Sequence, residues 1–177
     1  ARSLADRLAK KLPEEGCEVL ELSEMIQYGG DQVRAISRGL YPVELDSGGL
    51  AGALQELATS ASKRVPTFFN CRDEIDVPNV ELSTNLYRIA QEAVNNALRH
   101  AKPRRISIIL RLTQTQLILA VEDDGVGIPA DKDSPTGMGL HIMRYRASSL
   151  GARLDFGNTP TGGAWVRCLL PASALHQ

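Results

Sequence analysis

Five polar side chains recur at helical spacing in the middle of the chain, and their types suit the binding of a metal ion and phosphate. They are Asn85, Arg88, Glu92, Asn96 and Arg99, which fall within one narrow stripe of a helix at about 100° per residue. A carboxylate and an amide one turn apart can hold a hydrated Mg²⁺, and a following arginine can meet phosphate oxygens. Polar stripes are also common on solvated helix faces, so both interpretations stay open.

A second candidate site is the acidic, glycine-rich segment at residues 122–129, EDDGVGIP. Gly125 and Gly127 allow the backbone to turn sharply and a planar ligand to come close. Asp123, just before them, has acceptor oxygens suited to an exocyclic amino group. An ordinary tight turn at the end of a strand has a similar composition, so this segment alone does not decide between the two.

A third candidate site is the segment TGMGL at residues 136–140, which opens a predicted helix. Glycines at a helix N-terminus expose backbone N–H groups and the positive end of the helix dipole, which favour phosphate. The segment matches neither the P-loop nor the Rossmann fingerprint. The three segments follow the order polar helix, strand, Asp-x-Gly-x-Gly and Gly-x-Gly. Together, in this order, they are a more specific functional signal than any one of them alone.

These segments need a mixed set of helices and strands to position them. Apolar periodicity predicts helices at about residues 50–57, 80–101 and 140–150, and strands at about 65–71, 106–110, 117–121, 153–156 and 164–170. The strands and helices do not alternate regularly, which favours an α+β fold with a mostly antiparallel sheet.

The first forty residues have a different pattern. Apolar residues from Val19 to Leu40 alternate at spacings of three and four, which is typical of a coiled coil or helical bundle. One amphipathic helix packed on its own domain is the alternative. The chain begins within a helical pattern and without methionine, so we interpret it as a fragment of a longer protein.

Composition excludes several classes of protein. The 177 residues are 43% hydrophobic with a net charge of −1, which is globular and gives no general electrostatic reason to bind nucleic acid or an anionic membrane. Three cysteines with no CxxC pair argue against a disulfide framework or zinc site. The chain contains no apolar run long enough to span a bilayer.

The three polar segments closely resemble the N, G1 and G2 boxes of the GHKL ATPase superfamily, which includes histidine kinases, gyrase-type topoisomerases, Hsp90 and MutL. The resemblance covers residues 45–171. Within it, residues 87–101, YRIAQEAVNNALRHA, and the segments at 40–45 and 49–54 are similar to the histidine kinases that pair with LuxR-type (NarL-like) response regulators. The short stretch between Ile128 and Gly137 suits the abbreviated lids of this subfamily.

The resemblance implies a Bergerat fold, a two-layer sandwich of helices on a mixed, mostly antiparallel sheet. It implies that residues 1–43 are the C-terminal part of dimerisation helices, residues 44–173 the ATP-binding catalytic domain and residues 174–177 a tail. It also implies a homodimer in the full protein, a cytoplasmic location whether or not that protein is membrane-anchored, and no contact of this fragment with nucleic acid or membrane.

The resemblance also implies roles for single residues, with ATP and Mg²⁺ as cofactors. Asp123 would accept a hydrogen bond from the adenine amino group. Asn96 and Glu92 would be the catalytic pair, with Asn96 as a Mg²⁺ ligand and Glu92 as a base or a part of the metal's water shell, while Arg99 would face the phosphates. The remaining ATP-binding positions would be His100, Gly125, Gly127, Ile128, Gly137, Met138, Gly139 and Leu140.

The function implied is transfer of the ATP γ-phosphoryl group to a histidine of the dimerisation domain, for relay to an aspartate of a LuxR/NarL-type response regulator. None of His100, His141 and His176 is followed by an acidic residue, as the family's acceptor is. We therefore expect the acceptor to lie upstream of this fragment, which would not phosphorylate itself. The alternatives are a GHKL ATPase, an anti-sigma-factor serine kinase, or a catalytically lapsed interaction module.

Overall fold

A computed structural model describes residues 48–72, 74–128 and 138–176, which belong to one compact unit, Leu45–Gln177. Its centre is a five-stranded sheet in the order β1-β2-β3-β5-β4. Strands β1 and β2 are parallel, and the other neighbours are antiparallel. The strands are β1 (Thr67–Cys71), β2 (Ile106–Leu112), β3 (Gln116–Asp123), β4 (Arg153–Asn158) and β5 (Ala164–Pro171).

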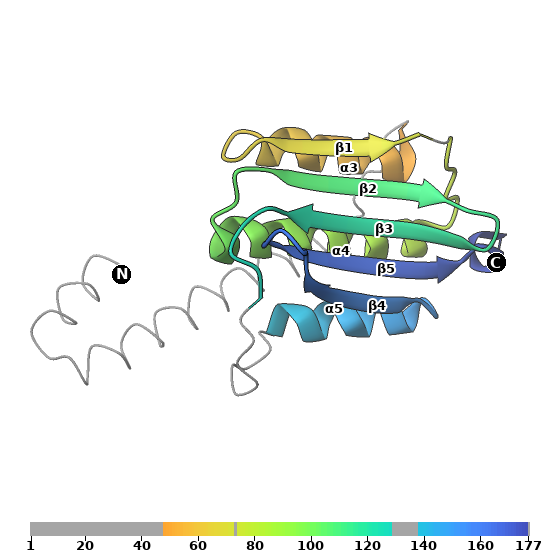
Figure 1. Cartoon of the computed structure of the whole chain (residues 1–177). Helices are drawn as coiled ribbons and strands as arrows, with labels where there is room; N and C mark the ends of the chain where they lie inside the picture. Colours follow the sequence, from red (N-terminus) through yellow and green to blue (C-terminus); the bar gives the residue numbers. More distant parts are fainter. Residues whose placement is uncertain (1–47, 73, 129–137, 177) are drawn as a thin grey trace, which may run out of the picture. The chain divides into compact units, whose positions relative to one another are not determined.

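Three helices cover one face of this sheet (Figure 1). They are α3 (Gly49–Ala61), which lies over β1 and β2, α4 (Val80–Asn96), over β3 and β5, and α5 (Met138–Ser149), over β4. The result is a two-layer α+β sandwich with a mixed, mostly antiparallel sheet, as the sequence predicted.

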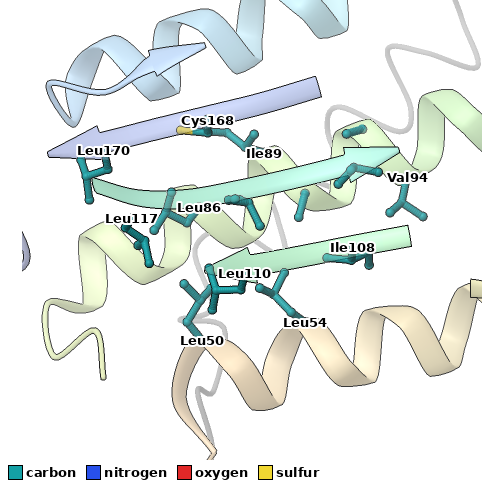
Figure 2. Close-up of a cluster of buried hydrophobic side chains, with 14 of the residues drawn as sticks. Leu50, Leu54, Leu86, Ile89, Val94, Ile108, Leu110, Leu117, Cys168 and Leu170 are labelled. Atoms are coloured by element: carbon teal, nitrogen blue, oxygen red, sulfur yellow. The ribbon is translucent and has the colours of Figure 1, made fainter. Parts of the chain in front are cut away.

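The core lies between the helices and the sheet. Alternate residues of β2 and β3 point to the helices, and directly opposite residues such as Leu110 and Leu119 share that face. Leu54 of α3 and Leu86 of α4 meet them from the other side (Figure 2). Burial of each such side chain contributes about 1.5–3 kcal/mol, so this core fixes the helices on the sheet.

The helix that carries the first polar stripe begins at a side-chain cap. The Asn79 side chain accepts a hydrogen bond of 3.0 Å from the backbone N–H of Leu82, which satisfies one unpaired donor of the first turn. The predicted helix at 80–101 is correct in extent, but it is not one uniform α-helix. Its last turn, η1 (Ala97–Ala101), is a π-helix, and Lys102 ends it in the left-handed conformation.

Most of the predicted C-terminal tail, residues 174–177, belongs to a packed helix. Ala172–His176 forms a 3₁₀-helix, η2, that packs against β3 and β5. Leu175 is buried in the core, so the packed part of the chain continues beyond Ser173. The predicted dimerisation segment at residues 1–43 lies outside the described residues, and the division into domains stays a prediction.

Candidate functional site

The described residues of the three segments predicted to act together lie at one end of the sheet. In Figure 1 the end of β3, the end of α4 with η1 and the beginning of α5 all lie at this end. The carboxyl end of α4 supplies Glu92 and Asn96, β3 supplies Asp123 and α5 supplies Gly139. The sheet register and the packing of α5 on α4 therefore bring together residues up to 47 positions apart in sequence.

Gly139 is the closest link between the first and third segments. A Cβ atom at this position would overlap Oε1 of Glu92 and would lie 3.3 Å from Nδ2 of Asn96. A larger residue at this position would require the carboxylate end of Glu92 to turn aside and the Asn96 amide to shift slightly. The N-terminal end of α5, where the helix dipole is positive, thus lies directly over the predicted metal-binding pair.

Glu92 lies in a desolvated but positively charged environment. Burial raises the pKa of this carboxyl above its ordinary value of 4.5, while the charges of Arg99, Arg146 and His100 hold back part of the rise. A half-buried carboxylate beside three basic groups can bind the water shell of a cation or hold a proton. The geometry is compatible with both roles expected of Glu92.

Helix α5 covers the polar stripe of α4 that sequence alone left as a possible solvated face. The guanidinium of Arg146 donates a hydrogen bond of 2.9 Å to Oδ1 of Asn85. Burial and the nearby charge of Arg88 lower the pKa of Arg146, and Glu92 raises it. Arg146 lies outside the three segments that the sequence indicated. Its contact with Asn85 spans 61 positions, so no local pattern indicates it.

Asp123 points toward the helix layer from the last position of β3. Its register partner is Ile106, which is buried on that face, and opposite residues in an antiparallel pair share one side of the sheet. Its Oδ1 accepts hydrogen bonds from the backbone N–H groups of Gly125, at 2.8 Å, and Ala164, at 3.3 Å. Both bonds end on Oδ1, so Oδ2 can accept a bond from a ligand.

The neighbouring Asp124 has a different task. Its Oδ1 accepts backbone hydrogen bonds of 2.8 Å from Arg104 and from Arg105. Slight desolvation raises the pKa of Asp124, but these bonds outweigh it and the pKa is lowered overall. Asp124 is exposed, and its two hydrogen bonds hold the backbone of the segment before β2. Of the two aspartates, only Asp123 is placed to bind a ligand on the helix side of the sheet.

The glycine loop after β3 packs tightly on the π-helical turn. A Cβ atom on Gly125 would overlap the carbonyl oxygen of Ala101, and the next residue, Val126, donates a backbone hydrogen bond of 3.0 Å to that same oxygen. π-Helical turns are often found at functional sites. Here the turn presents a carbonyl that holds the loop in place.

Two further glycines, Gly162 and Gly163, lie in the β4–β5 turn, which packs against this loop. Both have positive φ, at 91° and 70°. A Cβ atom on Gly163 would overlap the backbone carbonyl oxygen of Asp123. Gly163 therefore allows the turn to approach the backbone at the end of β3 more closely than any residue with a side chain could.

The remaining residues predicted to bind ATP differ in how exposed they are, and some lie outside the described residues. Arg99 and His100 are exposed on η1, and Leu140 is partly buried against the core. Gly137 and the side chain of Met138 lie outside the described residues. Within the described ranges, no three His, Cys, Asp or Glu side chains cluster closely enough to hold a metal ion by themselves, and none of the helices has the length and apolar composition needed to cross a bilayer.

Comparison with known proteins identifies one family and related proteins with similar descriptions. Residues 81–174 match the family described as histidine kinase-, DNA gyrase B-, and HSP90-like ATPase. The chain is 31% identical to sensor protein VraS of Staphylococcus saprophyticus over 151 residues, which is 85% of this chain and 43% of that protein. It is 31% identical to sensor histidine kinase LiaS of Bacillus subtilis over 145 residues, 80% of this chain and 39% of that protein.

Among solved structures, the histidine kinase domain of the blue-light activated histidine kinase from Erythrobacter litoralis EL346 is 29% identical. The match covers 72% of this chain and 63% of that domain, with a TM-score of 0.62. The chain spans less than half the length of the two curated relatives it matches.

Proposed function

Because this chain belongs to the histidine kinase-, DNA gyrase B- and HSP90-like ATPase family, we propose that it binds ATP where β3, α4 and α5 meet. The observation that carries this proposal is the approach of Gly139 to Glu92 and Asn96. It brings a helix N-terminus, which suits phosphate, against a carboxylate and an amide, which suit Mg²⁺. Asp123, at the end of β3, supplies the acceptor for the adenine amino group.

The donor set of α4 fits a magnesium ion. Asn96 offers an amide oxygen and Glu92 a carboxylate one turn before it, and Mg²⁺ usually keeps several waters and binds few protein groups together with substrate phosphates. When bound, the ion neutralises charge on the β- and γ-phosphates. Asn96 would hold it directly, and Glu92 would order its water shell.

The residues of this chain would position the nucleotide, because phosphoryl transfer depends mainly on positioning and charge neutralisation. Asp123 fixes the adenine end, and the backbone at Gly125 and Gly127 admits the planar base. Arg99 and the N-terminal N–H groups of α5 face the phosphate end. The γ-phosphoryl group would then pass to an imidazole presented by a separate helical domain.

In the longer protein, we place the acceptor histidine on the dimerisation helices of a homodimer and the final phosphate on an aspartate of a LuxR/NarL-type response regulator. The likeness to a sensor protein and to a sensor histidine kinase supports a two-component partner, and the similarity of residues 87–101 to one subfamily favours this regulator type. A cytoplasmic location of this domain is part of the same proposal.

A radiolabel experiment on the longer protein tests the phosphoryl transfer. With ATP labelled at the γ-position, the proposal predicts a protein label that is stable in base and lost in acid, as phosphohistidine is, and that moves to a response regulator. Rapid release of free phosphate without any labelled protein would favour an ATPase. A label that survives acid would favour a serine kinase.

A further inference from the structure

The side chain of Asn158, at the end of β4, forms two hydrogen bonds with the backbone of Ile128. Its Oδ1 accepts a hydrogen bond of 2.6 Å from the Ile128 N–H, and its Nδ2 donates one of 2.9 Å to the Ile128 carbonyl oxygen. One amide group therefore satisfies both backbone groups of a residue 30 positions away, as a neighbouring strand would. A carboxamide is suited to this because it carries a donor and an acceptor side by side.

The residue before Ile128 is shaped to admit this contact. Gly127 has a φ of 76°, which disfavours any residue with a side chain. A Cβ atom there would also lie 2.9 Å from Oδ1 of Asn158 and 3.1 Å from the carbonyl oxygen of Gly163. Both the positive φ and the narrow space beside Asn158 and Gly163 therefore favour glycine at this position.

Asn158 is itself held in register with the aspartate of the site. Its backbone oxygen accepts a hydrogen bond of 3.2 Å from Nε1 of Trp165, and it pairs with Ala164 across β4 and β5. The N–H of Ala164 donates to Oδ1 of Asp123. A shift of Asn158 along the sheet would therefore also move the groups that orient Asp123.

We propose that Asn158 is a positioning residue that holds the Gly127–Ile128 backbone in the conformation that receives the adenine base. This role rests on the proposed nucleotide binding and adds a residue outside the three polar segments. Asn158 acts through Ile128 and Gly127, at the adenine end of the site. Its effect on affinity is therefore separate from the metal and the phosphates.

Two variants of Asn158 test this role, with Asn70→Asp as the matched control. Asn158→Ala removes both hydrogen bonds, and Asn158→Asp turns the donor into a second acceptor that faces the Ile128 carbonyl. Asn70 is exposed on β1, so Asn70→Asp makes the same change of charge away from the site. We expect each Asn158 variant to weaken ADP binding about tenfold, as loss of roughly 1.4 kcal/mol would, and the control to leave it unchanged.

Two readouts separate positioning from a general structural role. The factor by which ADP binding weakens should be the same with Mg²⁺ and with a chelator, and the midpoint of urea unfolding should stay close to that of the unsubstituted chain. In hydrogen exchange, the Ile128 amide should exchange faster in Asn158→Ala, while amides in the centre of β3 keep their protection.

Unchanged ADP affinity in Asn158→Ala, with faster exchange at Ile128, would overturn the positioning role and leave the proposed function intact. A loss of affinity that appears only with Mg²⁺, or only together with a lower unfolding midpoint, would also overturn it. Failure of the unsubstituted chain to bind ADP would instead contradict the proposed function, and this role with it.

Discussion

Single glycines decide how closely the parts of the site approach one another. Gly139 lies in the first turn of α5, where alanine would be the better helix former by about 1 kcal/mol. A methyl group at this position would displace the carboxylate end of Glu92 and crowd the amide of Asn96. The glycine is therefore explained by the contact that it allows and not by the helix it belongs to.

Gly139→Ala should weaken binding of ADP with Mg²⁺ by at least about tenfold, because the added methyl group displaces Glu92 and Asn96. Gly52→Ala is the matched control, since Gly52 is also a helical glycine and has open space around it. That substitution should leave binding unchanged and stabilise the fold by up to about 1 kcal/mol. Calorimetric titration and urea unfolding measure the two effects; equal binding by both variants would contradict the prediction.

The raised pKa of Glu92 makes stability depend on pH. The folded protein holds this proton more tightly than the unfolded chain, whose glutamate has the ordinary pKa of 4.5. The resulting contribution to stability is fully present below that pKa and is lost as the pH rises through the folded pKa. Ionised Glu92 in the folded protein therefore lowers stability at neutral pH.

Glu92→Gln should accordingly raise the thermal unfolding midpoint relative to the unsubstituted chain at pH 7–8, and the difference should shrink as the pH falls below about 4.5. Unfolding curves recorded across this range measure it. Glu56→Gln, on an exposed position of α3, serves as the control. A difference that is constant with pH would contradict the burial of Glu92 as its cause.

The sequence alone predicts those site residues that belong to a local sequence pattern. Asp123 and the glycines after it form a local pattern, and Glu92 and Asn96 share one helical stripe. Arg146 and Asn158 form their contacts across 61 and 30 positions, and nothing beside them in sequence reports those contacts. Their roles follow from the packing of α5 and the β4–β5 turn, which only the folded chain shows.

Among the elements, the π-helical turn η1 joins α4 to the glycine loop. The sequence predicts a helix through residue 101, because alanine and leucine favour one and Pro103 stops it. It does not predict that the last turn widens, since a π-turn is set by what it contacts. Here the carbonyl of Ala101 meets the N–H of Val126 and leaves no room for a side chain at Gly125.

Gly125→Ala should therefore both destabilise the fold and reduce nucleotide binding below detection. The added Cβ atom would meet backbone, which cannot turn aside as a flexible side chain can, so we expect a loss of about 1–3 kcal/mol in the free energy of unfolding. Urea unfolding and titration with ADP measure the two effects. A stable variant that binds ADP normally would show that the loop is not held by Ala101.

For the whole molecule, the sequence predicts the layers better than the sheet order. Alternating residues such as Ile106, Ile108 and Leu110 identify a strand with one buried face, and the irregular order of elements indicates α+β. The parallel pairing of β1 with β2 and the position of β5 between β3 and β4 depend on contacts between segments far apart in the sequence. They depend on which helix covers which strand, so no single segment carries them.

The central claim is that Asp123 anchors an adenine nucleotide, and calorimetric titration with ADP tests it most directly. Asp123→Asn keeps an acceptor for the Gly125 N–H but replaces the other oxygen with a donor. Asp124→Asn makes the same change on the neighbouring, exposed carboxylate, whose bonds to Arg104 and Arg105 an asparagine oxygen can still accept. We predict saturable binding by the unsubstituted chain and by Asp124→Asn, and a loss of at least about 100-fold in Asp123→Asn. Equal binding by all three chains, or binding by none, would contradict the account.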